Sequence, residues 1–153
     1  MSPRPFARRA LLAGLLAAGG AFAAHSSPIV VMNAWTRPVM AAGMTGAGYM
    51  IIANRGTIAD RLIGASSPAA AKVSIHQSRE VGGVMTMRPV PFLAIPARGK
   101  ASLAPGGFHL MLEGVKRPLK PGDRVPLSLR FARAGAVSAW LDVRVGPPGA
   151  MRM

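Results

Sequence analysis

The sequence has no cysteine, few acidic side chains and few aromatic ones, and each shortage excludes a class of protein. Without cysteine, the 153-residue chain can form no disulfide, thiol nucleophile, iron–sulfur cluster, zinc ribbon or cysteine-ligated blue-copper centre. Any bound metal must therefore be held by histidine, methionine, carboxylate or backbone groups. The five carboxylates are scattered and the histidines number three, so no acid–base pair or catalytic triad indicates an enzyme.

Nucleic acid is also a poor partner, although the formal net charge is +14. The arginines are spread along the chain, and aromatic residues, at 5%, are too few to form a stacking surface for bases. An anionic membrane surface or an acidic protein patch suits this charge better. Solubility alone is an equally good explanation of the charge.

The N-terminal segment has the pattern of an export signal. A basic start at residues 1–9 precedes the uncharged stretch 10–24, which is too short to span a bilayer and holds a small-residue cleavage site near Ala23. We predict a signal peptide over residues 1–23 and a periplasmic mature protein with no transmembrane segment. The pair Arg8-Arg9 leaves both the twin-arginine and the general secretory route open. Removal of three arginines lowers the net charge from +14 to +11.

Glycine and proline, eighteen and fourteen in the whole sequence, divide the rest of the chain into short apolar runs. This spacing predicts an all-β barrel or sandwich over residues 24–146 and argues against a helical bundle. The tail 147–153, which begins with Pro147-Pro148-Gly149, is expected to be disordered. The predicted strands are Ile29–Trp35, Gly46–Asn54, Arg61–Ser66, Lys72–Gln77, Val84–Val90, His109–Val115, Arg124–Arg133 and Val137–Val145.

Two of these runs place histidine on the face opposite the core. In Lys72–Gln77, Val73 and Ile75 alternate with Ser74 and His76, so the apolar pair is expected to point inward. In the run that begins at His109, the leucines at 110 and 112 take the core side. His109, Met111 and Glu113 then share the other face. A methionine beside histidine and glutamate on that face is not simply filling an apolar gap.

Met85 and Met87 form a second pair on one strand face. Gly82-Gly83 predicts a hairpin, which we centre near residue 81 so that His76 faces the Met85–Met87 stretch. Two imidazoles and two thioethers make a soft donor set. Magnesium and calcium prefer oxygen, zinc rarely takes methionine, and copper(I) is the ion for which thioether sulfur is a natural ligand.

The spacing of these residues resembles that of a known family. His76, Met87, His109 and Met111 reproduce the pattern H-x10-M-x21-H-x-M of the periplasmic copper A chaperones, the PCuAC proteins. Neighbouring segments, among them Pro105-Gly106-Gly107 and the run from Lys116 to Asp123, look like the family's blocks. The resemblance covers about residues 30–145.

The resemblance implies a small Greek-key, cupredoxin-like β-barrel that binds one copper(I) ion through His76, Met87, His109 and Met111. It also implies delivery of copper to the copper A subunit of cytochrome c oxidase or to a Sco-type protein. We expect the protein to be a monomer. No enzymatic activity is expected. The competing hypothesis is a metal-free β-sandwich binding module with a basic surface, in which the four side chains would scatter.

Other residues carry weaker expectations. Core packing is the favoured role of Met85, and a role as an alternate sulfur ligand for the metal is the other possibility. Met40 and Met44 are expected to be loop residues. Glu113 shares the ligand face but is expected only to orient water or the basic surface. Trp35 and Trp140 are expected in the core or at a partner contact, and His25 beside the cleavage point is a weak candidate for copper(II).

Overall fold

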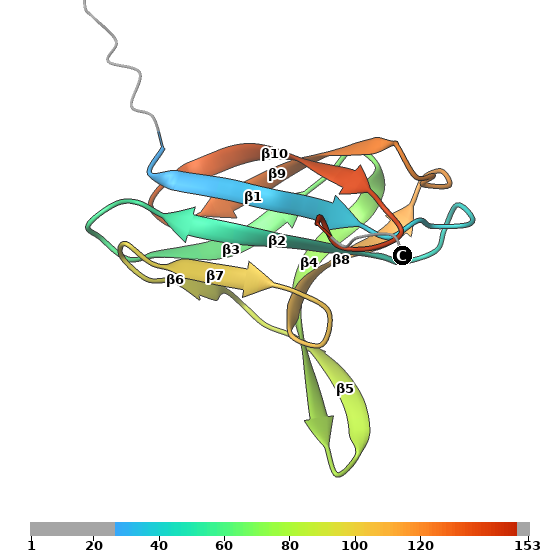
Figure 1. The fold of residues 1–153 in the computed structure, drawn as a ribbon, viewed down its shortest axis with the longest axis horizontal. Helices are drawn as coiled ribbons and strands as arrows, with labels where there is room; N and C mark the ends of the chain where they lie inside the picture. Colours follow the sequence, from blue (N-terminus) through green and yellow to red (C-terminus); the bar gives the residue numbers. More distant parts are fainter. Residues whose placement is uncertain (1–26, 150–153) are drawn as a thin grey trace, which may run out of the picture.

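The computed structural model describes residues 27–149, which form a barrel built of strands (Figure 1). The predicted signal peptide, His25 and the last four residues of the tail lie outside the described residues. Within 27–149, no helix has the length and apolar character needed to cross a membrane. In chain order the strands are β1 (Ile29–Thr36), β2 (Gly46–Asn54), β3 (Asp60–Ser66), β4 (Ala70–Val81), β5 (Val84–Pro89), β6 (Leu93–Ile95), β7 (Lys100–Leu103), β8 (Phe108–Val115), β9 (Arg124–Phe131) and β10 (Gly135–Val143).

Seven strands close the barrel in the order β4-β8-β2-β1-β10-β9-β3. The β3–β4 pairing closes the barrel through a single residue pair, Ala65 and Val73. Neighbouring strands are antiparallel except β1 and β10, which run parallel. The remaining strands lie outside the closed barrel: β5 pairs with β4, β6 pairs with β3, and β7 pairs with β2. The predicted all-β, cupredoxin-like barrel is therefore the observed architecture.

The barrel interior is filled by aliphatic side chains at alternate strand positions. In β9, Val125, Leu127, Leu129 and Phe131 are buried, while the residues between them face outward. The predicted inward positions on β4 and β8 are confirmed, because Val73, Ile75, Leu110 and Leu112 are all buried. The faces of β4 and β8 that carry the histidines are therefore the outer ones.

All eight predicted strands are present, with ends that differ by up to four residues. The sequence did not predict β6 and β7. Each is only three or four residues long and shows at most two buried positions, too few for an alternating pattern to stand out.

The β4–β5 hairpin projects from the barrel (Figure 1). Gly82 and Gly83 both have positive φ, 58° and 79°, as a two-residue type I′ turn requires. The turn therefore pairs Val81 with Val84, and its centre lies beyond the predicted position near residue 81. As a result His76 faces Pro89 rather than the Met85–Met87 stretch, and that part of the prediction is wrong.

Candidate metal centre

The two described histidines face each other across neighbouring barrel strands. His76 on β4 pairs directly with His109 on β8, so both side chains project from the same face. Their ring centroids are 6.0 Å apart and their planes differ by 21°. The antiparallel register thus brings together two residues that are 33 positions apart in the sequence.

His109 is buried although it lies off the core face, with 4% of its surface exposed. Its Nδ1 lies 3.2 Å from the Gly107 carbonyl oxygen, which can only accept, so Nδ1 carries the proton. Its Nε2 is then left with a lone pair. This atom is buried, and no group among residues 27–149 hydrogen-bonds to it. A buried polar atom without a partner is unusual in a folded protein and calls for an explanation such as a bound ion.

The two predicted methionine ligands lie on the same outer face. Met111 is two residues after His109 on β8, and it pairs with Ser74 of β4. Met87 pairs with Ser78, which is two residues after His76 and therefore shares its face.

A surface cavity of about 270 Å³ joins these side chains. Met87, His109 and Met111 line it, whereas His76 is not among its lining residues but stacks against the His109 ring. Tyr49 and Ser78 also line the cavity, and Arg37 is the one charged residue among the lining residues described. Three of the four predicted ligands therefore line one cavity, and the fourth, His76, neighbours one of them. A larger cavity of about 400 Å³ at the β3–β4 seam is lined by none of them.

The candidate donor atoms at this cavity are thioether sulfurs and imidazole nitrogens. Within residues 27–149, no group of three or more histidine, aspartate or glutamate side chains is placed to hold an ion. An ion at the cavity would therefore depend on the thioethers as well as the imidazoles. This set suits a soft monovalent ion and suits ions that prefer oxygen poorly.

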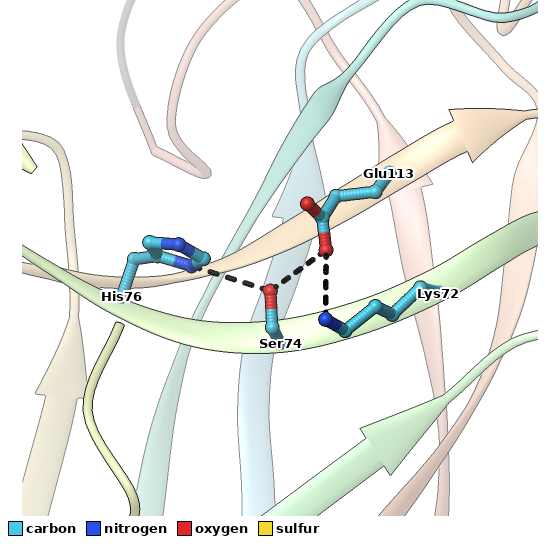
Figure 2. A network of polar contacts seen from close by, with 4 residues as sticks. All are labelled: Lys72, Ser74, His76 and Glu113. Carbon is cyan, nitrogen blue, oxygen red and sulfur yellow. Dashed lines mark hydrogen bonds and ion pairs between the residues drawn. The ribbon is translucent and has the colours of Figure 1, made fainter. Parts of the chain in front are cut away.

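A chain of polar contacts leads away from His76 (Figure 2). The Ser74 hydroxyl lies 3.3 Å from Nδ1 of His76 and donates a hydrogen bond of 3.1 Å to Oε2 of Glu113. The Lys72 Nζ lies 4.0 Å from the same carboxylate oxygen. Glu113 thus contacts Ser74 and Lys72 rather than facing the cavity.

Sequence reasoning missed three of the residues around this centre. Ser74 alternates with the core residues of β4 exactly as His76 does, so its i, i+2 spacing was a usable signal for a neighbour of that histidine. Tyr49 reaches the cavity through the β2–β8 pairing, and Arg37, which follows β1, reaches it through the pairing of β1 with β2. No local pattern in the sequence marks them.

The weaker candidates have mixed outcomes. The predicted core role of Met85 is wrong, because 57% of its surface is exposed on the projecting hairpin. Met40 and Met44 are exposed in the loop before β2, as expected. Trp35 is buried against Tyr49, with ring centroids 4.9 Å apart, whereas Trp140 is half exposed.

The family model LpqE-like, described as "Putative lipoprotein LpqE-like", matches residues 29–143, from β1 to the end of β10. A curated relative, "Putative lipoprotein Lxx21020" of Leifsonia xyli subsp. xyli, is 35% identical over 105 residues. The match covers 68% of this chain and 62% of the relative, so the chain spans less than two thirds of that protein's length.

Solved structures share the same barrel. The copper-bound PCuAC domain from PmoF2 matches with a TM-score of 0.65 at 22% identity, over 78% of this chain and 95% of that domain. At that identity the similarity concerns the fold alone. The solution structure of CuI-DR1885 from Deinococcus radiodurans matches with a TM-score of 0.58 at 30% identity, over 80% of this chain and 83% of that one. The fold implied by the sequence resemblance is confirmed.

Proposed function

We propose that this chain, which belongs to the LpqE-like family, is a copper(I) carrier. Its fold resembles those of the copper-bound PCuAC domain from PmoF2 and of CuI-DR1885. One ion of copper(I) is the cargo, and His76, Met87, His109 and Met111 are its ligands. The protein binds the ion and passes it to an acceptor, with no chemical turnover.

The observation that carries this proposal is the Nε2 atom of His109. It is buried, has no hydrogen-bond partner among the described residues, and keeps its lone pair because Nδ1 donates to Gly107. A buried polar atom left without a partner costs about 1–3 kcal/mol. A metal ion at the adjoining cavity would offset that cost, whereas a purely structural histidine would be expected to have both ring nitrogens satisfied or solvated.

The two thioethers support copper(I) over other ions. Met87 and Met111 are uncharged sulfur donors, and zinc sites normally recruit cysteine, histidine or carboxylate instead. Thioethers also hold copper less firmly than thiolates, so an acceptor with stronger ligands can remove the ion. This suits a carrier better than a permanent metal centre.

The exposures of the proposed ligands suggest how the ion leaves. His109 is buried and Met111 is half-buried, but 60% of the Met87 surface is exposed on the projecting hairpin. Met87 is therefore the ligand that a metal-binding side chain of the acceptor protein can displace first. The cargo would then remain on the two histidines and Met111 while the acceptor binds.

The proposal also includes the protein that accepts the copper and the compartment in which the carrier works. We place the carrier in the periplasm as a monomer, after removal of residues 1–23, and name the copper A subunit of cytochrome c oxidase or a Sco-type protein as acceptor. The alternative of a metal-free binding module required the four side chains to scatter. Three of them line one cavity and the fourth, His76, stacks beside His109, which argues against that alternative.

The test is an anaerobic copper(I) titration of the mature protein in competition with a chromophoric copper(I) chelator. We expect one copper(I) ion per chain, retained in the presence of excess zinc. Failure to compete with the chelator, or displacement of copper(I) by an equal amount of zinc, would contradict a copper(I) carrier.

A further inference from the structure

We propose that Ser74 and Glu113 are positioning residues, which hold the His76 imidazole in the tautomer that presents Nε2 to the cargo ion. This inference rests on the proposed function, because it assigns a role to residues that support one of the proposed ligands. It extends the site from the four ligands to the hydrogen bonds behind them.

The contacts arise from the pairing of β4 with β8. Lys72 pairs with Glu113 and Ser74 pairs with Met111, so all four side chains share the outer face that carries His76. Figure 2 shows the resulting chain, in which the Ser74 hydroxyl lies between the imidazole and the carboxylate.

The number of protons available fixes the direction of each hydrogen bond. A serine hydroxyl has one proton to donate, and an ionised carboxylate can only accept. Ser74 gives its proton to Glu113, so its oxygen must accept from Nδ1–H of His76. A neutral imidazole has a single N–H. The Nε2 atom of His76 is therefore left with its lone pair free for a ligand bond.

The second histidine reaches the same tautomer by a different route. His109 donates Nδ1–H to the Gly107 carbonyl oxygen, which also leaves Nε2 free. Both imidazoles thus offer the same atom, although one is fixed by the backbone and the other by side chains. Only the side-chain acceptor can be removed by substitution.

His76 has more need of such support than His109. It is half-buried on a strand that runs out into the projecting hairpin, whereas His109 is enclosed. Hydrogen-bonding partners of metal-bound histidines typically change metal affinity by about 10–100-fold when they are removed. The contribution of Lys72 is expected to be small, because its side chain is 72% exposed and that of Glu113 is 42% exposed.

The first experiment needs no metal. Long-range ¹H–¹⁵N spectra of the copper-free protein, in mildly alkaline buffer where imidazole is neutral, report which ring nitrogen of each histidine carries the proton. We expect Nδ1–H for His76 and His109. Glu113→Ala frees the Ser74 hydroxyl to donate to Nδ1, so His76 should shift toward the Nε2–H form. Ser74→Ala should give a mixture, and Ser74→Thr should restore Nδ1–H. The His109 signals should not move.

The second measurement is copper(I) affinity in the same variants. Ser74→Ala and Glu113→Ala should weaken it by about 10–100-fold, with Ser74→Thr close to the parent. Lys72→Ala and Ser102→Ala, a serine exposed on β7, serve as controls that should change neither the tautomer nor the affinity.

Two results would overturn the positioning role of Ser74 and Glu113 but leave the proposed copper(I)-carrier function standing. One is a parent His76 already in the Nε2–H form while copper(I) still binds tightly. The other is a Ser74→Ala or Glu113→Ala variant with parental tautomer and parental affinity. Absence of copper(I) binding by the parent would overturn the carrier and this role together, even if the tautomer responds as expected.

Discussion

Replacing His109 by leucine should weaken copper(I) binding by more than about 100-fold. Loss of a metal ligand lowers the affinity more than loss of a residue that only hydrogen-bonds to a ligand, which typically lowers it by about 10–100-fold. The same change should raise the free energy of unfolding of the copper-free protein by about 1 kcal/mol. Leucine fills a similar volume and removes the unpartnered buried Nε2 atom, and this gain outweighs loss of the Nδ1 bond to Gly107. Chelator competition and urea unfolding measure the two quantities.

His76→Leu is the matched control for this prediction. His76 is half-buried and its Nδ1 has a partner, so the substitution should also weaken copper(I) binding but should not stabilise the copper-free protein. Opposite changes in affinity and stability are therefore specific to His109. A His109→Leu protein that is strongly destabilised and retains parental copper(I) affinity would assign His109 a structural role instead.

Replacing Met87 and Met111 together by leucine should remove the preference for copper(I). The thioether sulfurs are the soft donors of the set, and leucine conserves their volume without a donor atom. We expect copper(I) affinity to fall by at least about 100-fold, with zinc and copper(II) binding through the two imidazoles much less affected. Competition titrations with each ion measure the change.

Met85→Leu and Met40→Leu provide matched controls, because both methionines are exposed and neither lines the cavity. Each should leave copper(I) affinity at the parental value. Met85 is the sharper control, since it is two residues before Met87 on the same face of β5. If Met85→Leu costs as much affinity as Met87→Leu, the sulfur ligand from this strand has been misassigned.

Much of this candidate site could be predicted from the alternation of side chains along single strands. The i, i+2 spacing placed Leu110 and Leu112 in the core and His109 with Met111 on the outer face, and it did so from eight residues of sequence. The same rule placed Ile75 inward and His76 outward. A one-residue slip would have exchanged these faces, so the buried leucines fix the register of β8.

Burial and register between strands depend on information that no single strand contains. The hairpin centre is set by the positive φ of both Gly82 and Gly83, which moved the partner of His76 to Pro89. Tyr49, Pro105 and Gly106 line the same cavity as His109, although they come from other segments of the chain. The direction of the hydrogen bond from Ser74 requires Glu113, a residue 39 positions away.

X-ray absorption spectroscopy of the copper(I)-loaded mature protein tests the central claim most directly, because it counts the nitrogen and sulfur neighbours of the ion. The account predicts two nitrogen and two sulfur neighbours around a single copper(I). A first shell of nitrogen and oxygen alone, with no sulfur, would contradict it.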